Sequence, residues 1–278
     1  MKDNFGDRMK EYEAAETNRH FIPLLPIYAR IDGRCFSSFT QGMERPYDKT
    51  MSSIMVEATK YLVESTHAKI GYTQSDEISL VWLQESYESE MFFCGKIQKL
   101  CSVLASMATA KFNHLCNDSV LQDRARKMLP AFDCRVFQLP NRVEAANAFL
   151  WREKDATKNA ISMAARSFYS HKALHGKSSA EMQEMIFQKG QNFNDYPAFF
   201  KRGTFVRRIT ELRHMTDDEL ALIPEKHWPK APIMRSRVIE LDMPIFTKVL
   251  NRDAVIFDGA APDVRSEYSG AEVNDAKS

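Results

Sequence analysis

The chain has 278 residues, of which 44% are hydrophobic and 27% are charged, so its composition is that of an ordinary globular protein. The length permits one large domain or two modest ones. Because the formal net charge is only +1, binding of polyanions through overall charge is excluded, and any such contact must come from local basic clusters.

The first half of the chain alternates between short apolar runs and amphipathic stretches. The expected elements are a helix over residues 7–17, a strand over 27–31, a helix after Asp48, strands over 68–72 and 78–83, a helix over 90–116 and a strand over 134–139. Asp48 is a typical N-cap, and the apolar face of its helix is formed by Met51, Ile54, Met55, Ala58 and Leu62. The order β-α-β-β-α-β predicts an α+β fold with a ferredoxin-like antiparallel sheet and both helices on one face.

The second half is predicted to be mainly helical. Helices are expected from residue 142 to about 170, and Ser178 and Glu181 form a capping box that opens another helix to about residue 188. Strands are expected over 204–212 and 235–241, and a loose tail after about residue 259. His171 and His175 have a spacing that metal ligands can adopt, but they lie at a predicted helix end and are interpreted as surface residues.

The sequence indicates a reducing compartment and no membrane contact. The five cysteines are scattered, without a C-x-x-C pair or the spacing of a zinc finger, which predicts free thiols. The N-terminus lacks the basic-then-apolar order of a signal peptide. The longest apolar stretch, over residues 21–29, contains two prolines and is too short to span a bilayer. We therefore expect a cytoplasmic protein.

Two acidic residues follow predicted strands that are neighbours in the expected sheet. Asp32 ends the first strand, and Asp76 lies in the connection between the second and third strands, with Glu77 beside it. Strand one lies beside strand three in this topology, so the two aspartates can meet at one edge. Facing carboxylates repel each other unless a cation lies between them, and Mg²⁺ accepts a few carboxylates together with phosphate oxygens.

Groups near this pair would suit a nucleotide. The Gly33 carbonyl can add a hard oxygen ligand, and Arg30, Arg34 and Arg45 can neutralise a triphosphate. Two Mg²⁺ ions can activate an attacking oxygen and stabilise a leaving one. The alternative is structural, because Asp-Gly and Ser-Asp-Glu are also common turn sequences.

Two motifs are more specific in their residue sequence than in their spacing along the chain. Arg30-Ile31-Asp32-Gly33-Arg34-x-Phe36 and Gly71-Tyr72-x-Gln74-Ser75-Asp76-Glu77-x-Ser79 resemble the tRNA-His guanylyltransferase family, and most of all its bacterial and phage guanylyltransferase-like branch. Shorter stretches at residues 6–10, 45–48, 98–102 and 189–197 support the resemblance, which runs in one order from about residue 5 to about 205.

This resemblance implies an enzyme with a polymerase-like palm. Residues 1–205 would form the palm-like catalytic region with helical additions, and residues 206–278 a C-terminal extension of unknown role. The implied activity is a nucleotidyltransferase that extends the 5′ end of tRNA in the 3′-to-5′ direction. GTP and ATP would be substrates, two Mg²⁺ ions cofactors, and the assembly a homotetramer.

The resemblance also implies roles for individual residues. Asp32 and Asp76 would be catalytic metal ligands, with the Gly33 carbonyl as a further ligand and Glu77 in support. The implied nucleotide-binding residues are Arg30, Asp32, Gly33, Arg34, Cys35, Phe36, Ser37, Arg45, Asp48, Ser75, Asp76, Lys96, Lys99, Asn192 and Asn194.

One departure from the family pattern bears on the substrate. Members that act on tRNA-His usually carry His-x-Asn-Asn-Leu-Tyr-Asn, whereas the matching stretch here is Thr157-Lys158-Asn159-Ala160-Ile161-Ser162-Met163. Only Asn159 persists from the asparagines, and Ser37 replaces a histidine that is common in the first motif. These changes favour templated repair of 5′-truncated tRNA over non-templated addition to tRNA-His.

Two basic clusters are candidates for RNA contact, and two other functions remain open. The clusters are Arg124, Arg126 and Lys127, and Lys201, Arg202, Arg207, Arg208 and Arg213. A palm-type nucleotide cyclase or dinucleotide synthase would use a similar carboxylate pair. A non-catalytic RNA-binding protein could keep the same fold.

Overall fold

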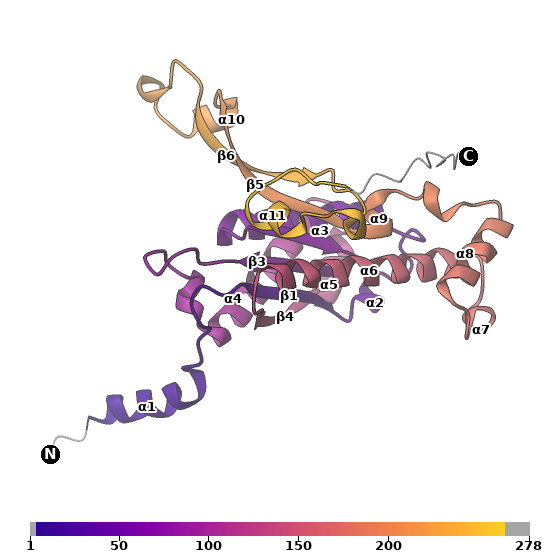
Figure 1. Cartoon of the computed structure of the whole chain (residues 1–278), viewed down its shortest axis with the longest axis horizontal. Helices are drawn as coiled ribbons and strands as arrows, with labels where there is room; N and C mark the ends of the chain where they lie inside the picture. The colour runs from indigo at the N-terminus through magenta and orange to yellow at the C-terminus, as the bar shows by residue number, and fades with distance from the viewer. Residues whose placement is uncertain (1–3, 265–278) are drawn as a thin grey trace, which may run out of the picture.

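The computed structural model describes residues 4–264, whose strands form one antiparallel sheet in the order β4-β1-β3-β2-β5-β6 (Figure 1). The strands are β1 Ile27–Arg34, β2 Ile70–Gln74, β3 Glu77–Trp82, β4 Ala131–Gln138, β5 Thr204–Arg213 and β6 Ile233–Leu241. The part β4-β1-β3-β2 has the order of a ferredoxin-like sheet, so the predicted α+β palm fold is confirmed. β5 and β6 extend this sheet beyond β2.

The helices of the described chain connect and cover these strands. They are α1 Phe5–Thr17, α2 Phe36–Phe39, α3 Lys49–Thr66, α4 Ile97–Asn117, α5 Gln122–Met128, α6 Arg142–Arg166, α7 His171–Leu174, α8 Ser179–Gln188, α9 Ala198–Arg202, α10 Asp217–Ala221 and α11 Arg252–Phe257. Short 3₁₀ turns lie at Phe92–Gly95, Phe193–Asp195, Glu225–His227 and Phe246–Lys248. None of these helices is long and apolar enough to cross a membrane.

Several local predictions are confirmed and two boundaries are corrected. The Asp48 side chain accepts the backbone N–H of Met51 at 2.9 Å, and Ser178 forms its capping box with Glu181. The helix expected from residue 90 begins only at Ile97, because Phe93 and Cys94, inside the turn Phe92–Gly95, adopt positive φ angles of 50° and 51° that a right-handed helix cannot include. The strand expected from Cys134 begins three residues earlier, at Ala131, where it pairs with Arg34.

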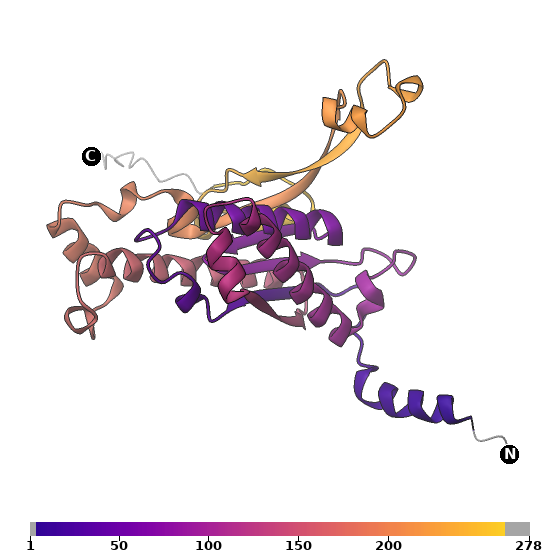
Figure 2. The same cartoon turned by 180° about the vertical axis from the view of Figure 1, so that it is seen from behind.

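Successive side chains along each strand point to opposite faces of the sheet, so the hydrophobic core has two layers. Ile27, Ala29 and Ile31 of β1 point to one face, where α3 and α4 pack together, as the sequence predicted. Tyr28 points to the other face and packs on Phe149 of α6, with their ring centroids 4.9 Å apart. α11 completes that second layer, and Figures 1 and 2 show the two helical layers on opposite sides of the sheet.

Two segments extend away from this body. The ribbon of β5 and β6 carries α10 at its far end, and α1 extends at the opposite side without a buried residue (Figures 1 and 2). The expected boundary at residues 205 and 206 falls inside β5, whose pairing with β2 crosses it. The tail expected after residue 259 includes a hydrogen bond from Leu250 N to Asp263 O, and its last residues, 265–278, lie outside the described chain.

Candidate active site

The end of β1 and the turn between β2 and β3 meet at one edge of the sheet. Asp32 and Glu77 are cross-strand partners, and Gly33 N donates to the carbonyl oxygen of Asp76 at 3.0 Å. Ser75 adopts a positive φ of 55°, which lets Ser75 and Asp76 form a two-residue hairpin turn. The topology thus brings together the two aspartates that the sequence singled out.

A wide cavity of about 920 Å³ opens beside this edge. Its walls come from β1, the hairpin turn, the segment from α2 to the start of α3, the second half of α6, and α9. The predicted residues on its lining are Arg30, Asp32, Phe36, Ser37, Arg45, Asp48, Ser75, Asp76 and Glu77. The cavity also includes residues that the sequence analysis did not assign to nucleotide binding, among them Gln74, Arg152, Asp155, Asn159 and Arg166.

The electrostatics of the edge favour a bound cation. Burial raises the pKa of the Asp76 carboxyl, a hydrogen bond from Ser75 opposes this, and the negative charge of Asp32 raises the pKa further. Within residues 4–264 no group of three or more Asp, Glu, His or Cys side chains could hold a metal ion. The carboxylates of Asp32 and Asp76 instead form an incomplete oxygen set. That set suits Mg²⁺, which takes its other ligands from water and phosphate.

Glu77 is held by arginines instead of facing the two aspartates freely. Arg152 of α6 donates to both carboxylate oxygens, at 2.6 and 2.8 Å, and also to Asp155 at 3.1 Å. Arg30 lies 3.9 Å from the same glutamate. Burial raises the pKa of Glu77, and the hydrogen bonds and charge of Arg152 oppose that shift. Sequence reasoning missed Arg152, although a charged residue on the apolar face of α6 was a signal for it.

Phe36 is mainly a core residue. Its side chain is 3% exposed and packs against Phe39, Phe112 and Phe132, with ring centroids 5.0 to 5.3 Å apart. The ring also lies on Gly33, where an added Cβ would be 2.4 Å from it, so this glycine permits the close packing. The predicted contact of Phe36 with a nucleotide is therefore limited to the part of the ring that lines the cavity.

Seven of the predicted nucleotide-binding residues do not line this cavity, and one of them is Gly33, whose Cα lies under the Phe36 ring. Arg34 and Cys35 are exposed at the start of α2. Lys96 pairs with His20, and Lys99 lies over the Phe93 ring, at the end of the sheet opposite the aspartates. Asn192 caps the turn that contains Asn194, outside the cavity wall. His171 and His175 are both exposed, as expected for surface residues.

Comparisons with known proteins identify the family of this chain. Residues 6–140 match the family model described as tRNAHis guanylyltransferase. The structure is similar to that of a bacterial tRNA(His) guanylyltransferase-like protein in complex with ATP, with 32% identity and a TM-score of 0.74 over 92% of this chain and 98% of that chain. The chain belongs to the tRNAHis guanylyltransferase family. It is thus a nucleotidyltransferase, as the two motifs predicted.

Other relatives within the guanylyltransferase family support the assignment. A structure of a bacterial guanylyltransferase-like protein with GTP shares 33% identity and a TM-score of 0.69, covering 88% of this chain and 95% of that one. The tRNA(His) guanylyltransferase of Saccharomyces cerevisiae is 29% identical over 216 residues, which are 72% of this chain and 90% of the yeast protein. The similarity therefore extends well beyond the two motifs.

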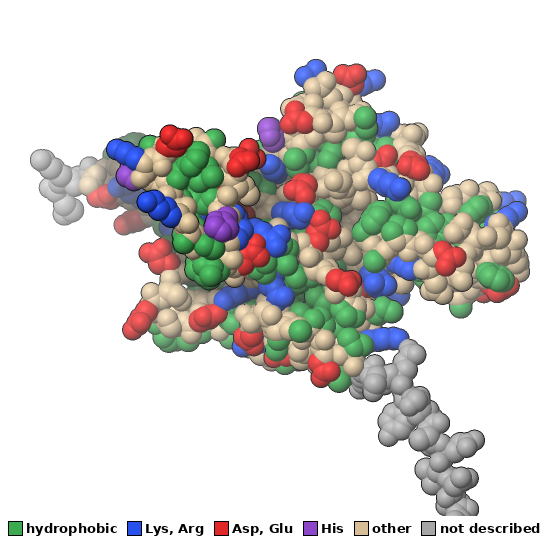
Figure 3. Space-filling view, turned by 90° about the horizontal axis from the view of Figure 1, so that it is seen from above, with side chains coloured by type: hydrophobic (Ala, Val, Ile, Leu, Met, Phe, Trp, Pro, Cys, Tyr) green, Lys and Arg blue, Asp and Glu red, His purple; other side chains and the backbone are tan. Residues whose placement is uncertain are grey.

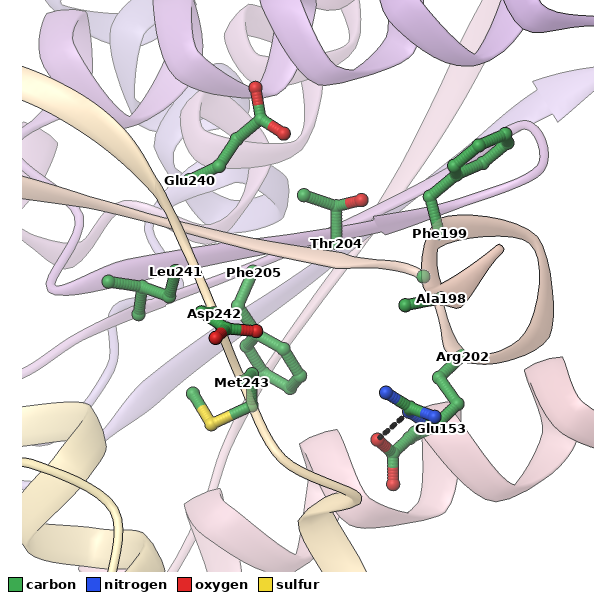
Figure 4. A pocket seen from close by; sticks show the side chains of 11 residues that line it. Glu153, Ala198, Phe199, Arg202, Thr204, Phe205, Glu240, Leu241, Asp242 and Met243 are labelled. Atoms are coloured by element: carbon green, nitrogen blue, oxygen red, sulfur yellow. Dashed lines mark ion pairs between the residues drawn. The ribbon is translucent and has the colours of Figure 1, made fainter. Parts of the chain in front are cut away.

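A second, smaller pocket of about 170 Å³ lies between α6, α9 and the ends of β5 and β6 (Figure 4). Phe199 lines both this pocket and the cavity of the candidate site. Glu153 lines the smaller pocket and is 3% exposed. Its two carboxylate oxygens accept the backbone N–H of Phe246, at 3.1 and 3.0 Å, and Arg202 lies 3.9 Å away. Glu153 thereby ties α6 to both α9 and the C-terminal segment.

Stability is expected to depend on the ionisation of Glu153. Burial raises the pKa of this carboxyl from 4.5 to about 7, and the Phe246 N–H and Arg202 only partly oppose the shift. Between pH 4.5 and about pH 7, the Glu153 carboxyl is mainly protonated in the folded chain and mainly ionised in the unfolded chain. The free energy of unfolding therefore falls as pH rises through this range. The loss is at most ~3 kcal/mol. Glu153→Gln keeps an acceptor for Phe246 but removes the titration.

Urea denaturation at pH 5 and pH 8 checks this expectation. The wild type should lose stability relative to Glu153→Gln as pH rises. Glu184→Gln, which changes an exposed glutamate of α8, is the matched control and should track the wild type. A constant difference between wild type and Glu153→Gln at both pH values would contradict the prediction.

Proposed function

We propose that this chain adds nucleotides to the 5′ end of tRNA in the 3′-to-5′ direction, with GTP and ATP as substrates and two Mg²⁺ ions as cofactors. The observation that carries the proposal is the convergence of Asp32 and Asp76 at the edge of the 920 Å³ cavity. Support comes from the similar bacterial structures, which hold ATP and GTP.

The lining residues have chemistry suited to this reaction. Asp32, Asp76 and the Gly33 carbonyl would hold the ions, which when bound would supply positive charge to the attacking hydroxyl and the leaving oxygen. Arg30 and Arg45 can bind phosphate oxygens, and the hydroxyls of Ser37 and Ser75 can donate to them. Asp48 already caps α3, so it would orient Arg45 and the loop before the helix more than bind a nucleotide directly.

The bond changes follow from the direction of growth. The 3′-hydroxyl of the incoming nucleotide attacks the 5′ phosphate of the RNA, and a new phosphodiester bond forms. The bond from that phosphorus to its leaving group breaks, releasing pyrophosphate from a 5′-triphosphate or AMP from a 5′-adenylylated end. A cavity with room for both reactants holds them close together, which lowers the entropic part of the barrier.

Templated repair of a 5′-truncated tRNA is the proposed biological reaction. Asn159 lines the cavity, but Thr157 occupies the position of the family histidine and donates its hydroxyl to the carbonyl of Glu153 within α6. Position 157 therefore has no imidazole that could recognise a particular tRNA. Base pairing with the opposite strand of the acceptor stem would then select the nucleotide.

The two basic clusters differ in how much charge they leave for RNA. In the second cluster, Arg213 forms a bidentate ion pair with Glu219, and Arg208 lies 3.7 Å from Glu64. In the first cluster, Arg124 binds backbone carbonyls of the α2 segment, while Arg126 and Lys127 are exposed. We therefore propose the first cluster, on α5, as the tRNA contact.

A homotetramer is the proposed assembly. The β5–β6 ribbon and its tip expose Leu212, Leu222, Trp228 and Met234. Figure 3 shows apolar side chains among charges of both signs on the face of the molecule that is seen from above. Such exposed apolar side chains are typical of contacts between subunits. Because Lys96 and Lys99 lie far from the aspartates of their own chain, they would act on a nucleotide only at the site of another copy.

An incorporation assay tests the proposed function. The protein is incubated with Mg²⁺, labelled nucleoside triphosphates and a tRNA that lacks its first 5′ nucleotide, with either a monophosphate or a triphosphate at its end. We expect the label at the RNA 5′ end, and less on intact tRNA-His. No 5′ label with either RNA would refute the proposal. Cyclic or linear dinucleotides formed from triphosphates alone would favour a cyclase or dinucleotide synthase instead.

A further inference from the structure

The hairpin turn carries Asp76 and Glu77 side by side in the sequence, yet they have different surroundings. Asp76 lines the cavity beside Asp32, whereas the Glu77 side chain, also on the lining, is 12% exposed and its carboxylate is bound by Arg152. Both nitrogens that bind it come from Arg152, whose own side chain is 11% exposed. A two-point arginine contact fixes both the position and the plane of a carboxylate.

Additional contacts keep Arg152 in this orientation. Its guanidinium also donates to Asp155, one turn further along α6. The guanidinium groups of Arg152 and Arg30 lie 4.5 and 5.4 Å from the centre of the Trp151 ring. The ring therefore supports both cations that approach Glu77.

We propose that Arg152 is a positioning residue that withholds the Glu77 carboxylate from divalent cations, so that the ions bind on Asp32 and Asp76 alone. Without this contact, Glu77 would be a third carboxylate at the same edge, because it is the cross-strand partner of Asp32. Three carboxylates hold a divalent cation more tightly and leave fewer positions for phosphate oxygens. This inference rests on the proposed function, because it assumes the two-aspartate metal site.

The test is a double-mutant cycle read by Mn²⁺ binding, with Mn²⁺ as the paramagnetic substitute for Mg²⁺. Free Mn²⁺ is measured by electron paramagnetic resonance during titration of the full chain without nucleotide. In the presence of Glu77, Arg152→Gln should tighten Mn²⁺ binding about tenfold, the scale typical of changes around metal ligands. In the Glu77→Gln background, the same substitution should change Mn²⁺ affinity less than about twofold.

Two further variants separate this effect from loss of charge or of folding. Arg166→Gln removes a positive charge from the same cavity and helix, at a distance from Glu77, and should leave Mn²⁺ affinity within about twofold. Arg152→Lys keeps the charge but not the two-point contact, so it should also tighten binding, by less than Arg152→Gln. Thermal melting shows which variants are folded.

A second readout is the Mg²⁺ concentration that gives half-maximal nucleotide addition. It should fall in Arg152→Gln while the maximal rate decreases, and both effects should be smaller when Glu77 is also replaced. The proposed role of Arg152 would be overturned if Arg152→Gln tightened Mn²⁺ binding equally with Glu77 present and in the Glu77→Gln background. It would also be overturned if neither Arg152→Gln nor Arg152→Lys tightened Mn²⁺ binding. If the wild type binds no Mn²⁺, or if Asp32→Asn binds it equally well, the metal site of the proposed function fails instead.

Discussion

Asp76→Asn is expected to lower the rate of 5′ nucleotide addition on the order of 10³-fold or more, because it removes a charged ligand from the two-ion site. An amide oxygen is a weaker ligand for Mg²⁺ than a carboxylate. The main-chain contact that positions the turn, from Gly33 N to the carbonyl oxygen of Asp76, does not depend on the side chain. The variant should therefore fold and lose only activity.

The charges of Asp32 and Asp76 also predict how their substitution changes the stability of the protein. Burial and, to a smaller extent, the charge of Asp32 raise the pKa of the Asp76 carboxyl, so removing one of the two charges relieves repulsion in the metal-free protein. Asp76→Asn and Asp32→Asn should accordingly keep or slightly increase the melting temperature. Single-turnover addition to 5′-truncated tRNA measures the rate. Asp218→Asn, at an exposed position on α10, is the control and should keep full activity. Undiminished addition by Asp76→Asn would remove this residue from the mechanism.

The fold could be predicted where the determining interactions are local. Asp48 and Ser178 cap their helices within three residues, and the apolar face of α3 is encoded by its helical period. The order of the first strands then limits the sheet to few topologies. By contrast, the positive φ angles of Phe93 and Cys94 fall on residue types that rarely adopt them, and the pairing of β5 with β2 joins residues about 130 positions apart.

Some residues of the candidate site could likewise be predicted from local sequence, whereas others depend on contacts between distant parts of the chain. Asp32 and Asp76 could be found because both were expected at strand ends that the topology brings together. The end of the first strand was wrong, since β1 continues to Arg34 and includes Asp32. Arg152 could not be assigned to Glu77, because a sequence separation of 75 residues leaves no local pattern that pairs them. Likewise, the family resemblance implied phosphate binding by Lys96 and Lys99, but they follow a turn whose Phe92 stacks on Trp82, the cross-strand partner of Ile27 at the other end of the sheet.

Gly203→Ala is expected to cost about 3 kcal/mol or more of folding free energy, because both the backbone and the space at this position require glycine. Gly203 joins α9 to β5 with φ 76° and ψ −173°, a region that residues with a Cβ essentially do not occupy. An added Cβ would lie 2.5 Å from the carbonyl oxygen of Thr73 and 2.7 Å from the Tyr72 ring. The carbonyl belongs to β2, which is paired on both sides, so it cannot move away cheaply.

Gly203→Ala should also lower the rate of nucleotide addition, because α9 borders both cavities. Phe199 lines the two pockets, and the hydroxyl of Tyr72 donates to the carbonyl oxygen of Arg202 at 2.8 Å, so displacement of Gly203 would shift this wall. Gly190→Ala is the matched control: its φ is 80°, but nothing lies within 4 Å of an added Cβ, so it should cost only ~1 kcal/mol. Urea denaturation measures both variants, and similar losses would mean that close packing at Gly203 contributes little beyond its backbone angle.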